Sequence, residues 1–308
     1  MIQSIRMAGS TRTVRTRSAR ALALAAAAVL GTAGAAHAQG ASDLFLVHLR
    51  EAGGRLSADS VVRLTDRDGY DNQPQFTAGG RALLYTSIDA TGQADIRRLD
   101  LRTRQDGNLT RTAPESEYSA TLMPGGERMT VIRVEADSTQ RLWSFRLDGS
   151  DPRLLLERLA PIGYQAWIDA DRIAVFVLGS PATLQLANVA DGTARVVASD
   201  IGRSLNRVPG GSAVSFVDRA DGAPGWIAEF DADSGAIRRL VRALPQNEYH
   251  AWTPSGILLS AADSTLYQWR PGDADWTPIA DLAAAGVTGV SRLTVSPDGR
   301  LLALVASH

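Results

Sequence analysis

The chain of 308 residues contains no cysteine. Disulfide bonds, thiol nucleophiles and cysteine-ligated zinc are therefore excluded, and the fold must be stabilised by its apolar core. A chain of this length buries most of its apolar surface on folding, so such a core is sufficient. Lysine is absent as well, and all 32 basic residues are arginine.

An excess of basic charge is also missing. The 33 acidic residues and 32 arginines give a formal net charge of −1. Five arginines lie within the first 20 residues, so the rest of the chain holds 27 arginines against 33 acids, a net charge of −6. Nucleic-acid binding depends on a basic surface, so we predict no nucleic-acid partner.

Residues 1–38 have the pattern of a secretory signal peptide. An arginine-rich, acid-free start is followed by an alanine-rich run at residues 21–36, and residues 36–38 read Ala-His-Ala, an A-x-A cleavage site. An uncleaved anchor helix is the alternative, but the run is shorter and less apolar than a membrane span requires. We therefore predict a mature domain at residues 39–308, periplasmic or secreted, with no membrane span.

The remaining chain repeats at intervals of 46, 45, 41, 44 and 43 residues. An aromatic or apolar anchor recurs at this period and is followed each time by a turn rich in proline, glycine or aspartate. Periods of this length are typical of propeller blades. The anchors are Phe76, Leu122, Trp167, Val208, Trp252 and Val295.

Each repeat has room for four short antiparallel strands, which predicts an all-β fold, a six-bladed β-propeller. The last unit has only two strands, and the N-terminal strands, the first of them expected at residues 44–49, are predicted to complete its blade and close the ring. The fourth strand of the first repeat is expected at residues 108–110, and the anchors Trp167 and Trp252 are expected to be buried. A helical turn is expected only within residues 281–285. The predicted blades are 72–111, 117–157, 162–199, 203–243, 248–280, and 289–308 together with 43–66.

Two stretches carry a family resemblance. Residues 76–87 read Phe-Thr-Ala-Gly-Gly-Arg-Ala-Leu-Leu-Tyr-Thr-Ser, and residues 296–300 read Ser-Pro-Asp-Gly-Arg. They resemble the WD40-like (PD40) repeat of the TolB-type β-propeller family. The resemblance implies the fold, export, and binding of proteins or small ligands on one propeller face. It covers the propeller only, because the predicted strands begin at residue 43 and leave no room for the α/β domain that precedes the propeller in TolB.

Signatures of catalysis are missing. The chain contains no G-x-S-x-G nucleophile elbow and no H-E-x-x-H zinc motif. Residues 39–308 hold three histidines, of which His48 lies in an apolar strand pattern and His308 ends the chain. The sequence therefore favours a binding module over an enzyme, without a cofactor.

Polar and aromatic residues recur at the entry to each innermost strand. In a propeller these entries surround the mouth of the central channel, where a ligand could be held by convergent polar groups. The alternative for the tyrosines is packing between blades. Arg292 occupies the equivalent position in the sixth unit. The candidate ligand-binding residues are Gln73, Tyr118, Tyr164, Arg203, Tyr249 and His250.

We expect a monomer that binds an envelope protein, a peptide or a small ligand. One alternative is a lactonase-like hydrolase with a divalent metal in the channel, for which Asn72, Glu117, Asn206 and Glu248 are possible oxygen ligands. Another is a sensor of a sugar or peptidoglycan fragment, which aromatic side chains such as Trp252 would stack against.

Overall fold

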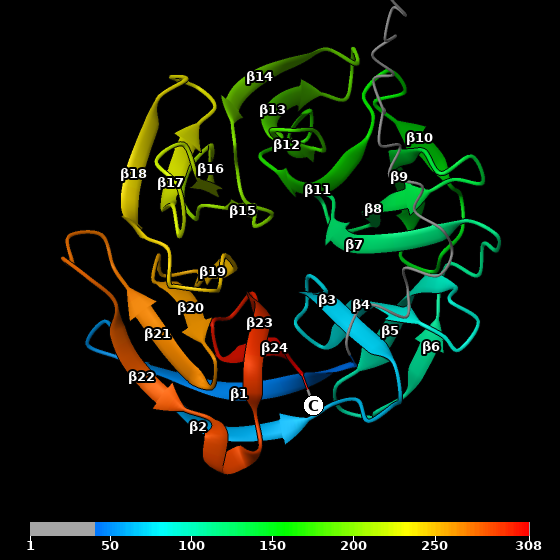
Figure 1. The fold of residues 1–308 in the computed structure, drawn as a ribbon. Coiled ribbons are helices and arrows are strands. Elements are labelled where there is room, and N and C mark those ends of the chain that lie inside the picture. The colour runs from blue at the N-terminus through cyan, green and yellow to red at the C-terminus, as the bar shows by residue number, and fades with distance from the viewer. Residues whose placement is uncertain (1–40, 308) are drawn as a thin grey trace, which may run out of the picture. The chain divides into compact units, whose positions relative to one another are not determined.

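The computed structural model describes residues 41–307, whose helices and strands are almost all β-strands joined by turns and loops (Figure 1). The predicted signal peptide, residues 1–38, and His308 lie outside the described residues. The only helix within the described range is the 3-10 turn η2 (Ala283–Ala285), inside the segment where a helical turn was predicted. Across residues 41–307 no helix is long and apolar enough to cross a membrane.

Four of the sheets have four antiparallel strands each, formed by strands that follow one another in the chain. The first two sheets consist of β7 (Ser116–Leu122), β8 (Arg128–Val134), β9 (Gln140–Arg146) and β10 (Arg153–Leu155), and of β11 (Ile162–Trp167), β12 (Arg172–Val177), β13 (Thr183–Asn188) and β14 (Ala194–Ser199). The other two consist of β15 (Asn206–Arg207), β16 (Ala213–Asp218), β17 (Trp226–Asp231) and β18 (Ile237–Arg242), and of β19 (His250–Trp252), β20 (Leu258–Ala262), β21 (Thr265–Trp269) and β22 (Thr277–Asp281).

The remaining eight strands form one sheet that joins the two ends of the described chain. The N-terminal strand β1 pairs antiparallel with the C-terminal strand β24, from Ser42 opposite Ser307 to His48 opposite Leu301. By contrast, β1 meets β3 through a single parallel pair, Ser42 with Tyr70. The strands are β1 (Ser42–Ala52), β2 (Arg55–Arg63), β3 (Tyr70–Phe76), β4 (Ala82–Ile88), β5 (Ala94–Asp100), β6 (Asp106–Asn108), β23 (Thr288–Val295) and β24 (Leu301–Ser307).

The core lies between the sheets. The second strand of each repeat is buried on both faces, as in β4, where all seven residues are buried, because neighbouring sheets cover it from both sides. The outermost strands are the exposed ones: Val196 of β14 and Ile237 of β18 are 55% and 45% exposed. This gradient explains why the second strand is nearly continuous in apolar residues, whereas the fourth mixes polar and apolar residues, as in the Ile-Arg-Arg-Leu-Val-Arg of β18.

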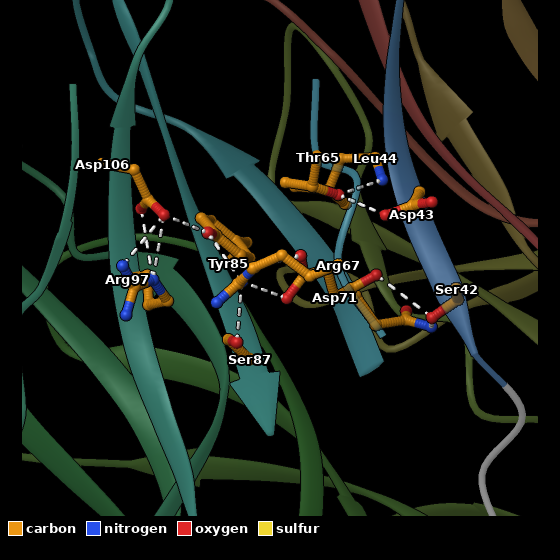
Figure 2. Close-up of polar contacts among 11 residues, drawn as sticks. Ser42, Asp43, Leu44, Thr65, Arg67, Asp71, Tyr85, Ser87, Arg97 and Asp106 are labelled. Atoms are coloured by element: carbon orange, nitrogen blue, oxygen red, sulfur yellow. Dashed lines mark hydrogen bonds and ion pairs between the residues drawn. The ribbon is translucent and has the colours of Figure 1, made fainter. Parts of the chain in front are cut away.

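A network of polar side chains connects β1 with the strands that follow it in the same sheet, β3 and β4 (Figure 2). The Ser42 hydroxyl donates to the Asp71 carbonyl oxygen at 3.2 Å. Arg67 forms an ion pair with Asp71 and donates to the hydroxyls of Tyr85 and Ser87 at 3.1 and 2.9 Å. The network crosses from β1 through the loop before β3 to β4, so it holds the junction where strand pairing is reduced to one residue pair.

Several predicted positions need correction. The first strand was predicted at residues 44–49 and runs from Ser42 to Ala52, because β24 and β2 both pair along it. The fourth strand of the first repeat was predicted at residues 108–110 and lies at Asp106–Asn108. The anchor Trp167 is 5% exposed, whereas Trp252 is only half-buried because it borders a cavity.

Candidate functional site

The innermost strands surround a central space, with β3, β7, β11, β15, β19 and β23 nearest to it (Figure 1). Each of them contacts the next in this order, and β23 contacts β3. Three cavities lie along the axis between these strands and share lining residues. We call the largest, of about 900 Å³, the mouth; the narrow middle, of about 110 Å³, the waist; and the third, of about 560 Å³, the tryptophan end.

Irregular backbone on the inner strands directs side chains into the mouth. The strand register shifts between Asn72 and Gln75 in β3 and between Tyr118 and Thr121 in β7. Within these shifts Gln73 has a φ of 57°, in the left-handed region that residues other than glycine rarely adopt. Such bulges turn a side chain out of the regular alternation, and they occur often beside binding sites.

The bulges are held by side-chain hydrogen bonds between repeats. The Gln73 side-chain oxygen accepts from the Ser119 backbone N–H at 2.8 Å and from the Thr86 hydroxyl at 2.7 Å. Ser119 has a φ of 54° and occupies the matching bulge one repeat later. The strained backbone is therefore a built feature of two adjacent repeats.

The six predicted site residues all line the mouth or the waist. Tyr118 lines the mouth alone, and His250 lines the waist alone. The residues that line both are Gln73, Tyr164, Arg203 and Tyr249.

His250 differs from the other five because it is a wall residue, 1% exposed. Its Nε2 lies 2.8 Å from the Ser215 hydroxyl, which also accepts from the Trp252 indole at 2.9 Å. Burial lowers the pKa of His250 to about 4, so the imidazole is neutral at pH 7. Ser215 is fully buried, so this serine–histidine contact supports the waist and offers no accessible nucleophile.

The predicted site list leaves out the residue at the centre of the mouth, Arg292 of β23. Its guanidinium carbon lies 4.1 Å from the ring centroid of Tyr249 and 5.1 Å from that of Tyr164. It also donates a hydrogen bond to the Tyr164 hydroxyl at 3.0 Å. Arginine keeps its proton at ordinary pH, so the Arg292 guanidinium is charged at pH 7.

Tyrosine hydroxyls surround this cation. Burial raises the pKa of Tyr70 to about 12 and also raises those of Tyr118 and Tyr249, so all three phenols are neutral at pH 7 and able to donate hydrogen bonds. Arg203 is exposed at the rim, where its backbone N–H donates to Glu248 at 3.0 Å. The mouth thus combines cationic and phenolic donors. The equivalence of Arg292 with Gln73 in the repeat was the sequence signal that could have placed it in the site.

The tryptophan end has a different chemistry. Trp167 donates from its indole to the Thr130 hydroxyl at 3.0 Å, and the half-buried Trp252 lines the same cavity. Arg207 is the only charged residue in the lining described for this cavity. Four turn prolines complete the rim: Pro124, Pro209, Pro254 and Pro297.

A divalent metal does not fit the residues of the channel. Within residues 41–307 no group of three or more histidines and carboxylates is placed to hold one. The two carboxylates considered as ligands are already in ion pairs, Glu117 with Arg133 at 2.8 Å and Glu248 with Arg219 at 2.5 Å. The arginines of the mouth would also repel a cation.

The chain matches no protein-family model and no curated protein. Solved structures match it at low identity and therefore show the fold alone. A TolB from Agrobacterium tumefaciens is 14% identical with a TM-score of 0.68, over 87% of this chain and 98% of that one. A TolB from Acinetobacter baumannii is 13% identical with a TM-score of 0.59, over 86% of this chain and 64% of that one, which is the longer protein.

An enzyme shares the same architecture. An oligogalacturonate lyase in complex with manganese is 17% identical with a TM-score of 0.55, over 80% of each chain. The described part of this chain is therefore an all-β protein of several four-stranded antiparallel sheets with a TolB-like propeller fold. Because TolB structures and a lyase both have this architecture, function has to be argued from the site.

Proposed function

We propose that this protein is an exported, TolB-like β-propeller that acts as a protein- or ligand-binding module of the cell envelope, in the periplasm or secreted, and works as a monomer. The observation that carries the proposal is the mouth, a cavity of about 900 Å³ lined by five of the six predicted site residues together with Arg292. Its volume lies in the range of small-molecule and peptide sites.

The proposed architecture is a closed ring of six blades at residues 39–308, after a signal peptide at residues 1–38. In this interpretation the eight-stranded sheet is two blades, β3 to β6 and the shared blade β23, β24, β1 and β2. The single residue pair between β1 and β3 supports this division. The seven pairs between β1 and β24 support closure by both ends of the chain, which leaves only short strand edges exposed.

Binding is favoured over catalysis by what the mouth contains. Its arginines and neutral tyrosines can donate hydrogen bonds and attract charge, but they supply neither a metal nor a general base paired with an accessible nucleophile. Strained bulges that fix Gln73 and Ser119 make the cavity preformed, which reduces the entropy lost on binding.

Capture experiments with matched variants test this function. Immobilised wild-type protein is exposed to an envelope extract, and the retained proteins and small molecules are identified by mass spectrometry. The double variant Tyr118→Ala/Arg203→Ala alters the mouth, and Arg207→Ala alters the tryptophan end as the control. We expect a specific set to be retained by the wild type and the control and lost by the mouth variant. Equal retention by all three would contradict the proposal.

Elemental analysis tests the metal-dependent hydrolase that the sequence left open. The purified protein is dialysed without chelator, and its divalent metals are measured by mass spectrometry. We expect less than about 0.1 metal ion per chain, because the channel carboxylates are paired with arginines and leave no site of the kind that hard cations need. One metal per chain would favour the hydrolase over the binding module.

A further inference from the structure

Arg292 has an incomplete set of partners. Among residues 41–307, no carboxylate forms an ion pair or hydrogen bond with it; its described contacts are the Tyr164 hydroxyl and the rings of Tyr164 and Tyr249. A guanidinium has five N–H donors, so several remain for another acceptor. A half-buried cation normally has an anionic partner, since desolvation of the charge is otherwise uncompensated.

Positive charge predominates around the mouth. Its lining holds Arg203, Arg219 and Arg292 but only one carboxylate, that of Asp200, which is exposed at the rim. Arg219 is neutralised by Glu248, whereas neither Arg203 nor Arg292 has an ion-pair partner within the described range. A positively charged cavity in a chain of negative net charge attracts anions to one place.

One part of the wall of the mouth is apolar. Ile132 and Phe176 are buried there, and Leu178 is 39% exposed although it is a large hydrophobic residue. The Phe176 ring meets the Tyr164 ring edge to face, with centroids 5.7 Å apart. A ligand that fills the cavity would therefore present its charge to Arg292 and an uncharged body to this wall.

We propose that the mouth binds a small organic carboxylate: its carboxylate lies between Arg292 and Arg203, the phenols of Tyr70 and Tyr164 hydrogen-bond to it, and its ring or aliphatic body packs against Phe176 and Leu178. This inference rests on the proposed binding function and names its ligand class. Arginine suits the role because its planar fork matches the two oxygens of a carboxylate.

Titration with matched probes tests the inference. Benzoate and D-glucuronate provide a carboxylate on an aromatic body and on a sugar, and benzamide and D-glucose are their neutral counterparts. Isothermal titration calorimetry at low salt is expected to show binding of at least one carboxylate and at least tenfold weaker binding of its neutral counterpart. The carboxylate that binds more tightly then shows whether the apolar wall accepts an aromatic ring or a sugar.

Variants of Arg292 and Arg207 show at which end of the channel the carboxylate probe binds. Arg292→Gln removes the charge at nearly constant size, and a charge-assisted hydrogen bond of this kind contributes about a 10- to 100-fold change in affinity. Arg292→Lys keeps the charge but lacks the planar guanidinium that can bind both carboxylate oxygens. Its affinity for the carboxylate should therefore lie between those of the wild type and Arg292→Gln. Arg207→Gln at the tryptophan end is the control and should bind like the wild type.

Two results would overturn the inference. One is that neutral probes bind as tightly as the carboxylates, and the other is that Arg292→Gln leaves carboxylate affinity unchanged or that no carboxylate binds. The capture experiment separates these failures from failure of the binding function itself. If capture still depends on the mouth, the mouth binds a ligand of another chemistry; if capture fails as well, both proposals fall.

Discussion

Two arginines in this protein lie across pairs of aromatic rings, and their surroundings differ in one respect. The Arg133 guanidinium is 4.6 Å from the ring centroid of Trp143 and 5.1 Å from that of Phe145, and it donates to the Glu117 carboxylate at 2.8 Å. Arg292 lies across two tyrosine rings at similar distances, with no carboxylate beside it in the described part of the chain. Both arginines therefore make cation–π contacts, but only Arg133 of these two also forms an ion pair within the described residues.

The difference shows how a buried cation can be a structural element or a binding element. Arg133 has its counter-ion on the neighbouring strand and needs nothing from outside. His250, the other buried base of the channel, lacks a counter-ion and has lost its charge, with a pKa of about 4. Arginine cannot release its proton at ordinary pH, so Arg292 keeps a charge that no carboxylate of residues 41–307 pairs.

The largest effect on stability is expected at the buried ion pair of Glu117 with Arg133. Glu117→Ala leaves Arg133 unpaired in the interior and should lower the free energy of unfolding by about 3–5 kcal/mol. The measurement is urea denaturation at pH 7 followed by tryptophan fluorescence. A loss below about 1 kcal/mol would mean that the aromatic rings alone satisfy Arg133, and the contrast with Arg292 would disappear.

The buried His250 imidazole is expected to make the stability of the protein depend on pH, with an effect of intermediate size. Its folded-state pKa of about 4 lies below the unfolded value of 6.5, so the stabilisation is complete above pH 6.5 and is lost as the pH falls from 6.5 towards 4. The shift corresponds to about 3 kcal/mol. We expect the stability of His250→Asn to fall less steeply over this interval than that of the wild type, with the exposed His48→Asn as control. Parallel curves for all three proteins would argue against a neutral buried imidazole.

The smallest effect on stability is expected at Arg292. Arg292→Leu removes a half-buried charge that has no ionic partner, so the free energy of unfolding should change by less than about 1 kcal/mol, in either direction. Thermal unfolding in buffer without carboxylates measures this change. A loss as large as that of Glu117→Ala would make Arg292 a structural residue like Arg133.

The sequence predicted the repeat well because turns and buried second strands leave strong local signals. Turns rich in proline, glycine or aspartate and continuous apolar runs depend on neighbouring residues, so their positions could be located without the fold. The first strand was underestimated because its length depends on pairing with β24, which is more than 250 residues away in the chain.

The candidate site was predicted less completely, for physical reasons. The repeat placed Gln73, Tyr118, Tyr164, Arg203 and Tyr249 at equivalent positions, and all five line the mouth. The repeat pattern could not show that no carboxylate of residues 41–307 pairs with Arg292, because such a partner would come from another repeat. The side-chain contact of His250 also comes from another repeat, because its Nε2 lies 2.8 Å from the Ser215 hydroxyl of β16, and no local pattern records such a contact.

A crystal structure of the protein with bound benzoate tests the central claim most directly, because it shows where an anion binds. The account predicts the carboxylate within hydrogen-bonding distance of the Arg292 guanidinium, with the ring against Phe176 and Leu178. Benzoate at the tryptophan end beside Trp252, with the Arg292 guanidinium unchanged and unpaired, would contradict it.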